Sequence, residues 1–289
     1  MKKVLSVACA LCMTTAMLTG CGSSNNAGTA ATGEAQNSAA ASTTTEQAST
    51  ATDAGTTLIA LITMDSLDQH WVTLNEGAQK AAAELGVTVQ FMAPNTKDDA
   101  QQIECVNNAV SAGAQAIIVA ANGPDAISSA LREASDAGVK LIYVDSPANV
   151  SAEATFSTDN NAAGKTAGEE MKKALADAGV TSGSIGIINV NAATDSCVMR
   201  EEGFRSAFEG TDFELLETQY GEGDAAKSQS IAENYITQGV VGIFGCNEGS
   251  TTGAGNAIKA SGKDNVIGVG FDKSDAILLS LIHISEPTR

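Results

Sequence analysis

The feature that most limits the fold of this chain is a regular alternation of apolar and amphipathic segments that begins after Thr57. Apolar runs of strand length alternate with stretches of helix length, which is typical of a parallel sheet covered by helices on both faces. The pattern predicts strands over residues 58–64, 87–92, 116–120, 140–144, 184–191, 213–219, 241–245 and 266–271. It predicts helices over residues 71–85, 98–111, 125–137, 162–178, 199–209, 225–237 and 251–260. We therefore expect an α/β fold with two doubly wound lobes, an N-terminal one over residues 57–158 and a C-terminal one over residues 159–278.

The charge balance excludes one class of partner. The chain has 34 acidic and 16 basic residues, which gives a formal net charge of −18. Such a chain lacks the basic surface that a nucleic-acid backbone requires. We therefore expect no nucleic-acid partner.

The cysteines do not form the framework of a disulfide-rich protein. Three of the six lie within the first 21 residues, which leaves Cys105, Cys197 and Cys246. An odd number of widely spaced cysteines does not fit a disulfide framework, and two histidines offer little to a zinc site. We expect these three to be small structural side chains, and we expect no metal and no cofactor.

The N-terminus has the pattern of an exported protein. Lys2 and Lys3 precede an apolar run over residues 4–17, and Leu18-Thr19-Gly20-Cys21 follows, so residues 1–21 are expected to be a signal peptide. The tetrapeptide resembles the lipobox of bacterial lipoproteins, which implies a lipid on Cys21; the alternative is an ordinary signal peptide in which Cys21 is incidental. Residues 22–56 contain no aromatic and no branched aliphatic residue, so we expect a flexible linker. The protein is then expected in the cell envelope, anchored on the outer face of the cytoplasmic membrane or periplasmic.

Polar residues gather where the expected strands end. In open α/β sheets, ligands bind beyond the carboxyl ends of the strands. These ends carry carboxylates, amides, one guanidinium and one indole, at residues 65–71, 122, 145–146, 191–200, 247–248 and 272. Such a set suits a polyhydroxylated ligand, because carboxylates and amides pair with hydroxyls and an aromatic face covers the apolar side of a sugar ring. We expect a sugar or polyol ligand.

Several segments resemble the type 1 periplasmic sugar-binding proteins of bacterial ABC transporters, the ribose- and galactose-binding kind. The similarity extends from about Thr57 to Leu278 and rests on Ile59-Ala60-Leu61-Ile62, Asn75-Glu76-Gly77-Ala78-Gln79-Lys80-Ala81-Ala82, Val144-Asp145, Ser157-Thr158-Asp159-Asn160, Ala163-Gly164, Glu202-Gly203-Phe204 and Val269-Gly270-Phe271-Asp272. The resemblance implies two Rossmann-like lobes, joined by three hinge strands, that close on a ligand by hinge motion. It also implies a monomer that delivers its ligand to a membrane permease. The alternative role is a sensory protein that presents its ligand to a chemoreceptor or sensor kinase.

The resemblance also implies the binding residues. They are Met64, Asp68, His70, Trp71, Asp145, Ser146, Arg200, Asn247 and Asp272. Two positions depart from the family pattern, because His70 replaces one member of an aromatic pair and Ser146 replaces an arginine. The missing arginine removes a bidentate donor, so ribose-like specificity is not implied.

Each of these residues has an alternative role. Trp71 could serve simply to attach the start of a helix to the core, and His70 could be a solvated loop residue. Asp145 and Asp272 could cap the helices that follow them. Arg200 could pair with Glu201 or Glu202 on a helix surface. Asn122, which precedes Gly123-Pro124, is expected to be a turn residue.

The sequence offers little to an enzyme. Gly164-Lys165-Thr166 ends like a phosphate-binding loop, but Asp159 occupies the position of the required upstream glycine. Gly249-Ser250-Thr251 is not a nucleophile elbow, and no Ser-His-Asp set is recognisable. We expect a binding protein without catalytic residues.

The last residues do not fit the fold. Residues 279–289 resemble the translation of a sequencing adapter rather than a continuation of the last lobe. We expect the native protein to be longer and the C-terminal lobe to be incomplete here. A chain cut at this point would expose apolar surface, so we expect it to fold poorly if expressed as written.

Overall fold

The structure is a computed structural model that describes residues 56–281. The predicted signal peptide with Cys21, the linker up to residue 55 and the tail after residue 281 lie outside the described residues. Among the residues that are described, no helix combines the length and apolar character needed to cross a membrane.

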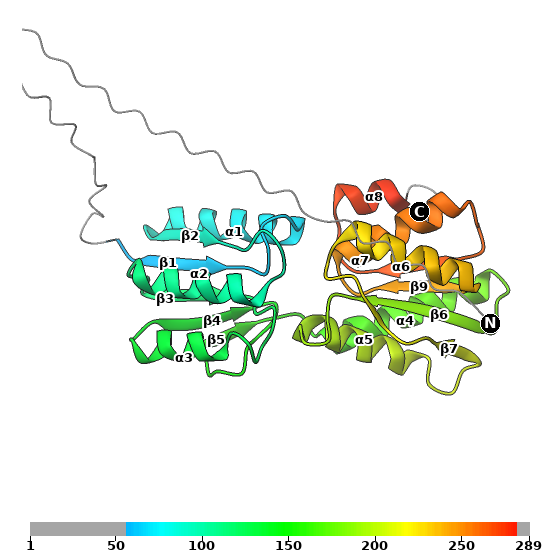
Figure 1. Ribbon diagram of the computed structural model, residues 1–289, viewed down its shortest axis with the longest axis horizontal. Coiled ribbons are helices and arrows are strands. Elements are labelled where there is room, and N and C mark those ends of the chain that lie inside the picture. Colours follow the sequence, from blue (N-terminus) through cyan, green and yellow to red (C-terminus); the bar gives the residue numbers. More distant parts are fainter. Residues whose placement is uncertain (1–55, 282–289) are drawn as a thin grey trace, which may run out of the picture. The chain divides into compact units, whose positions relative to one another are not determined.

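The first lobe is built on a parallel five-stranded sheet (Figure 1). Its strands, in the order β2-β1-β3-β4-β5, are β1 (Leu58–Ile62), β2 (Thr88–Met92), β3 (Ala116–Val119), β4 (Lys140–Val144) and β5 (Ala154–Phe156). The helices are α1 (Gln69–Leu85), α2 (Asp99–Ser111) and α3 (Ser128–Asp136). Because all the strands run parallel, their carboxyl ends meet at one edge of the sheet.

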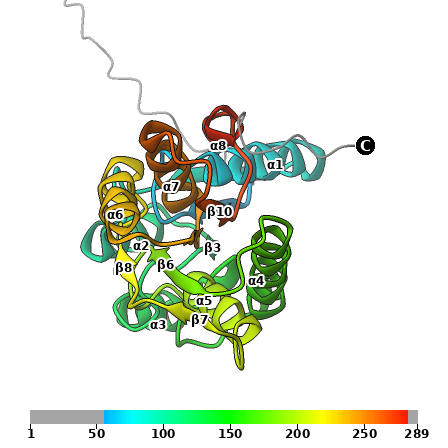
Figure 2. The ribbon, with the colours of Figure 1, turned by 90° about the vertical axis from the view of Figure 1, so that its right-hand side faces the viewer.

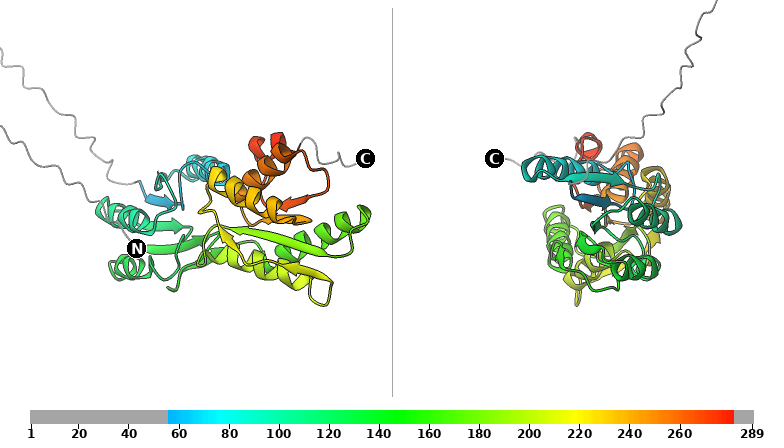
Figure 3. Two further views of the ribbon diagram at one scale, coloured as in Figure 1. Left: turned by 45° about the vertical axis from the view of Figure 1, so that its right-hand side comes forward. Right: turned by 90° about the vertical axis from the view of Figure 1, so that its left-hand side faces the viewer.

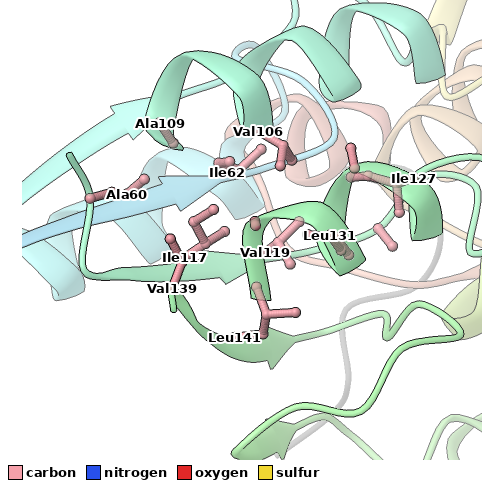
Figure 4. Close-up of a cluster of buried hydrophobic side chains, with 14 of the residues drawn as sticks. Ala60, Ile62, Val106, Ala109, Ile117, Val119, Ile127, Leu131, Val139 and Leu141 are labelled. Atoms are coloured by element: carbon pink, nitrogen blue, oxygen red, sulfur yellow. The ribbon is translucent and has the colours of Figure 1, made fainter. Parts of the chain in front are cut away.

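Both faces of this sheet are covered by helices. On one face, Ile62 and Ile117 of the strands pack with Val106 of α2 and Leu131 of α3, and all four are fully buried (Figure 4). On the other face, Trp71 of α1 packs against Met64 and Ala120. This two-sided burial explains why the strands are nearly continuous apolar runs in the sequence.

The second lobe repeats the arrangement. Its parallel sheet has the order β10-β9-β6-β7, with β8 also paired to β6, and its strands are β6 (Gly183–Asn189), β7 (Phe213–Leu215), β8 (Gln219–Tyr220), β9 (Gly242–Gly245) and β10 (Ile267–Gly270). The helices are α4 (Asn160–Asp177), α5 (Asp195–Ala207), α6 (Ala225–Gln238), α7 (Glu248–Ser261) and α8 (Asp275–Leu281). Figure 2 shows α4 and α5 on one side of these strands and α6 and α7 on the other, and Figure 3 gives two further views.

Each face of the second sheet has its own core. On the α4/α5 face, the rings of Phe204 and Phe244 stack with centroids 4.0 Å apart. On the α6/α7 face, the hydroxyl of Tyr235 donates to the carbonyl oxygens of Ile187 and Glu217. The first of these cores directly underlies the start of α5, so it fixes the position of the side chains that α5 presents at the end of the sheet.

Two glycines allow α4 and α5 to lie unusually close together. A Cβ atom on Gly164 would lie 2.0 Å from the carbonyl oxygen of Arg200, and one on Gly203 would lie 2.0 Å from that of Asn161. Neither position has room for a side chain. Gly164, which in the sequence looked like the end of a phosphate-binding loop, therefore serves helix packing and brings Arg200 next to the start of α4.

The predicted fold class is confirmed, with three local differences. The short strand β5 and helix α8 were not predicted, and the strand expected over residues 213–219 is two strands. The chain leaves the sheet between them because the guanidinium of Arg205 binds the carbonyl oxygen of Leu216 at 3.1 Å and the hydroxyl of Thr218 at 2.8 Å. Strand β5 has three residues, which is too short for a periodic pattern to appear.

The described cysteines are all free. Cys197 and Cys246 lie within the α4/α5 core, and Cys105 packs at the edge of the first-lobe core. The expectation that these are small structural side chains is confirmed for their packing, and Cys197 has a further position described below.

Candidate ligand-binding site

A small cavity lies where the strand ends of the two lobes face each other. Its lining residues are Met64, Asp68, His70, Trp71, Lys97, Asp145, Val190, Ser196, Cys197, Arg200, Asn247 and Asp272. Every residue predicted for the ligand site, except Ser146, is among them. The free space is about 20 Å³, which is close to the size of one water molecule. The two lobes are therefore closed on each other in this structure.

A buried ion pair supports the first-lobe wall of the cavity. The Lys97 ammonium pairs with Asp65 and lies 3.5 Å from the Asp68 carboxylate. Asp65 also accepts the backbone N–H groups of Leu67 and Asp68. Burial opposes ionisation, but the Lys97 charge and these hydrogen bonds outweigh it, so the pKa of Asp65 is lowered and the pKa of Lys97 is raised. Both groups are charged at neutral pH.

Asp68 has a second function, because it is the N-cap of α1. Its carboxylate accepts the backbone N–H of His70 at 3.1 Å. The carboxylate is therefore held in place from two sides, by the helix start and by Lys97. It faces the cavity in a fixed orientation.

Asp145 lies near side-chain nitrogen atoms from both lobes. Its carboxylate oxygen lies 3.6 Å from His70 Nε2 and 3.8 Å from Arg200 Nη2. Its backbone has φ 61°, in the left-handed region. The alternative that Asp145 caps the following helix is wrong, because the next helix, α4, begins at Asn160 and is capped by Asp159.

Arg200 is buried and turned inward from α5. Its Nε donates to Asn160 Oδ1 at 2.9 Å, its Nη1 donates to the carbonyl oxygen of Cys246 at 3.0 Å, and its guanidinium lies over the Phe271 ring at 4.4 Å. The alternative of a surface pair with Glu201 is wrong, because Glu201 binds Arg205 at 2.8 Å. This leaves the Nη2 side of Arg200 directed at Asp145 and the cavity.

The rings of His70 and Trp71, which follow the first strand, both line the cavity. Trp71 is 3% exposed and its ring meets that of His70 edge-on, with centroids 4.6 Å apart. The indole both packs in the core and lines the cavity, so the two roles considered for it do not exclude each other. Its Nε1 is buried with no hydrogen-bond partner among the described residues. A buried donor of this kind is costly unless something binds it.

Asn247 and Asp272 complete the second-lobe wall. Asn247 is the N-cap of α7, where its side-chain oxygen accepts the N–H of Ser250, while its buried Nδ2 has no partner in the described part of the chain. Asp272 has φ 73° and keeps exposed surface. It does not cap α8, whose first turn is held by the hydroxyl of Ser274. Burial and the carboxylates of Asp68 and Asp145 raise the pKa of Asp272, against the opposing effect of Arg200 and His70.

The expectation that Ser146 lines the site is not met. Ser146 is fully buried, and its Oγ lies 2.8 Å from Asp145 Oδ1 and 2.8 Å from the hydroxyl of Ser196, at the start of α5. The backbone N–H of Ser196 also donates to Ser146 Oγ at 3.3 Å. Its hydroxyl is bound to Asp145 and Ser196, which line the cavity while Ser146 does not. Ser146 therefore joins the two lobes beside the site.

Asn122 lies in the loop after β3, as expected of a turn residue, but it is buried and bonded. Its backbone N–H donates to Gln102 Oε1 at 3.0 Å, and its carbonyl oxygen accepts the hydroxyl of Thr194 in the second lobe at 2.8 Å. The amide of Gln102 also donates to the carbonyl oxygens of Thr63 and Ala120. Gln102 thus holds the ends of β1 and β3 together, and Asn122 links this edge to the other lobe.

Four lining residues were missed from the sequence: Lys97, Val190, Ser196 and Cys197. Lys97 follows β2 and Val190 directly follows β6, so the rule that ligands bind at strand ends could have found both. Ser196 and Cys197 lie in the first turn of α5, within the polar segment already noted over residues 191–200. Nothing in their spacing distinguishes them from the rest of that segment.

The site is rich in hydrogen-bonding groups. Within the described residues, no group of three or more His, Cys, Asp or Glu side chains is placed to hold a metal ion. The cavity combines carboxylate acceptors, a guanidinium, an amide donor and an indole. Such groups bind a neutral polar molecule by paired hydrogen bonds and a ring face.

Comparison with known proteins places this chain among solute-binding proteins. A model of the periplasmic binding protein domain matches residues 59–282. The ribose import binding protein RbsB of Haemophilus influenzae is 30% identical over 230 residues, which cover 78% of this chain and 76% of that protein. A solved carbohydrate transporter solute-binding protein from Agrobacterium radiobacter, in complex with D-arabinose, is 27% identical with a TM-score of 0.75, covering 79% of this chain and 80% of its own. The solved XylFII-LytSN complex contains a chain that is 25% identical with a TM-score of 0.72, covering 78% of this chain and 83% of that one.

Proposed function

This chain belongs to the periplasmic binding protein family, and from that premise we propose that it is the solute-binding lipoprotein of an ABC importer. It binds a sugar or polyol between its two lobes and delivers it to the permease. One observation carries the proposal: Asp68, Asp145, Arg200, Asn247 and Asp272, from both lobes, converge on one cavity beside the Trp71 ring. One relative is named a ribose import binding protein, and another was solved in complex with D-arabinose, which supports the same class of ligand.

The chemistry of the cavity suits hydroxyl groups. The carboxylates accept hydrogen bonds from sugar hydroxyls, and the free Nδ2 of Asn247 and Nε1 of Trp71 donate to hydroxyl or ring oxygens. Arg200 adds a charged donor, and the Trp71 ring covers the apolar face of a pyranose or furanose. Binding is non-covalent in this proposal, and no residue has a catalytic role.

Entry of the ligand requires the lobes to separate. A cavity of about 20 Å³ does not admit a sugar in the closed arrangement. The connection from β5 to α4, where the Ser157 hydroxyl donates to the carbonyl oxygen of Asp145, joins the two lobes and can act as part of a hinge. Hinge closure around a ligand is a common device for such proteins.

The proposed attachment to the membrane rests on the sequence. The Leu18-Thr19-Gly20-Cys21 segment supports processing and lipid attachment at Cys21, and residues 22–56 then act as the tether. A Cys21→Ala variant should appear in the soluble fraction of the producing cells. The wild type should stay with the membranes and should take up radiolabelled palmitate.

The binding proposal is tested by thermal shift and calorimetry with D-ribose, D-arabinose, D-allose, D-xylose and sorbitol. A ligand at 100 times its Kd should raise the free energy of unfolding by about 2.7 kcal/mol. At least one of these compounds should raise the Tm of the wild type and leave that of Asp272→Asn unchanged. If no sugar or polyol in a wider panel shifts the Tm of a folded sample, the proposed ligand class is wrong.

A second candidate is a sensory role, which the similarity to the XylFII-LytSN complex favours. The chemistry of the cavity is the same for both, so the test concerns the partner. In the native host, deletion of the gene should abolish uptake of the radiolabelled sugar if the protein serves a permease. Retained uptake, with lost induction of the sugar genes, would favour the sensory role.

A further inference from the structure

Lys97 reaches from the loop between β2 and α2 toward the second lobe. Its side chain is only 8% exposed although it follows an edge strand. The ammonium is neutralised within its own lobe by Asp65 and Asp68. Burial of a lysine is expensive, and these two carboxylates offset the cost.

The far side of Lys97 rests on Gly223 of the second lobe, in the turn between β8 and α6. A Cβ atom on Gly223 would lie 2.8 Å from Lys97 Nζ and 2.9 Å from both Cδ and Cε. A side chain at position 223 would therefore require the end of Lys97 or the turn itself to shift when the lobes are closed. The end of the lysine chain and the Gly223 backbone form a direct contact between the lobes.

Lys97 also stands between three hollows in the cleft. It lines the small ligand cavity, a hollow of about 290 Å³ that Asn95, Asp224 and Glu248 also line, and another of about 440 Å³ on the side of Asn122. Of the three, the ligand cavity is the smallest and the least open to solvent. The lysine chain therefore lies where the ligand cavity adjoins the two larger hollows.

We propose that Lys97 is the residue that seals the cleft: it positions the Asp68 carboxylate for the ligand and, by seating on Gly223, holds the lobes closed. The role of the seal in retaining sugar rests on the proposed function, but the closing contact itself does not. Separation of the lobes would withdraw Lys97 from Gly223 and open the cavity to the adjoining hollows.

The experiment uses Cys197, one of the residues that line the cavity, as a reporter of opening in the absence of any sugar. Cys197 is 3% exposed and burial raises the pKa of its thiol to about 11, so alkylation by N-ethylmaleimide is slow while the cleft is closed. The rate at each cysteine is followed by peptide mass spectrometry. In Lys97→Ala, Cys197 should react about tenfold faster, in proportion to the open population.

Two other cysteines give internal references. The half-buried Cys105 should react at an unchanged rate, because it lies away from the cleft. Cys246 is fully buried in the second-lobe core beside Cys197, so its reaction reports unfolding rather than opening. Loss of the Lys97 charge alone would raise the pKa of nearby thiols and slow their reaction, so faster labelling of Cys197 cannot arise from that charge effect.

Matched variants separate the contact from other effects. Gly223→Ala should also speed the labelling of Cys197, and adding Lys97→Ala to it should cause little further change. Gly210→Ala is the control, because Gly210 has the same φ of 73° as Gly223 but no atom within 4 Å of its Cβ position. Lys97→Met keeps much of the aliphatic chain, so its rate of Cys197 labelling should lie between those of the wild type and Lys97→Ala.

The results have clear meanings. Faster labelling confined to Cys197 in Lys97→Ala and Gly223→Ala, but not in Gly210→Ala, supports the seal. Cys197 rates within twofold of wild type in both variants would overturn it, and so would equal acceleration at Cys246. Absence of sugar binding in calorimetry, with the expected labelling pattern, would instead refute the proposed function and leave the closing contact standing.

Discussion

Arg200 and Asp145 come from different lobes and face each other across the cavity, with Arg200 Nη2 3.8 Å from Asp145 Oδ2. Because Arg200 is also held by Asn160 and by the carbonyl oxygen of Cys246, its guanidinium is fixed before a ligand arrives. Arg200→Met should lower the affinity for the bound sugar about 100-fold, which corresponds to a loss of roughly 3 kcal/mol for a charged donor. Calorimetry with the best sugar of the panel measures this.

The control for Arg200 is Arg205→Met, one turn further along α5. Arg205 binds Glu201, Leu216 and Thr218 and does not line the cavity. The Arg205→Met variant should be less stable than the wild type but should keep its affinity for the sugar. Equal loss of affinity in both variants would mean that Arg200 acts through the fold of α5 alone.

The pH dependence of stability should reflect Glu248. Burial, together with a hydrogen bond to Asp68 and its charge, raises the pKa of the Glu248 carboxyl from 4.5 to about 7. The folded protein therefore keeps a proton that the unfolded chain releases near pH 4.5. The contribution of the Glu248 carboxyl to the free energy of unfolding is therefore complete below pH 4.5, and it is lost as the pH rises to about 7. We expect the Tm to fall over this range, and Glu248→Gln should flatten the profile.

Part of the fall of the Tm with pH should remain in the Glu248→Gln variant, because the pKa values of Asp272 and Asp195 are also raised, chiefly by burial. Glu76→Gln, on the exposed face of α1, is the matched control and should keep the full wild-type profile. A Glu248→Gln profile that superimposes on the wild type would contradict the protonation of Glu248 near neutral pH.

Trp71 should report binding by fluorescence. It is the only tryptophan of the chain, so the emission comes from one site. A sugar that covers the indole and accepts a hydrogen bond from Nε1 changes its surroundings, and both the intensity and the wavelength of emission should shift. Titration with a sugar that calorimetry has shown to bind checks this, with Trp71→Phe as the blank. An unchanged spectrum in that titration would remove Trp71 from the ligand site.

The contact between Ser146 and Ser196 should contribute to affinity without touching the sugar. Both Oγ atoms lie between the lobes, 2.8 Å apart, so the contact exists only when the cleft is closed. Ser146→Ala should weaken binding by about tenfold or less, the loss of roughly 1 kcal/mol for one hydrogen bond. The double-mutant cycle with Ser196→Ala should show coupling of similar size in the affinity. Additive effects would mean that the two hydroxyls act independently.

Much of the fold could be predicted because buried parallel strands leave a plain signal. The runs around Ile62 and Ile187 are apolar on both faces. Three of the helices between them, α1, α2 and α4, begin at aspartate N-caps. The signal fails where backbone contacts rather than burial define an element, as in β5, which is held by pairing to β4. It fails again where one side chain diverts the chain, as Arg205 does between β7 and β8.

The site could also be predicted in part, from the positions at which the apolar runs end. Strand ends point to Asp145 and Asp272, since each follows an apolar run directly. Met64 lies inside the strand expected over residues 58–64 and was indicated by the family resemblance alone. The sequence could not show that the Ser146 hydroxyl contacts Ser196 rather than lining the cavity, because that depends on Ser196 approaching from the other lobe. Nor could it show that Asp68 and Asn247, rather than Asp145 and Asp272, cap helices, because capping depends on the backbone of the loop that precedes each helix.

The left-handed backbone of Asp145 and Asp272 has a consequence for how this protein can be improved. Such a backbone costs a residue other than glycine roughly 1 kcal/mol, and here two cavity carboxylates carry that cost. Replacing either by glycine should therefore make the protein more heat-resistant while it loses hold of its ligand. Selection for thermostability alone would favour variants that no longer bind, so any engineering of this scaffold as a sugar sensor has to screen for binding at every round.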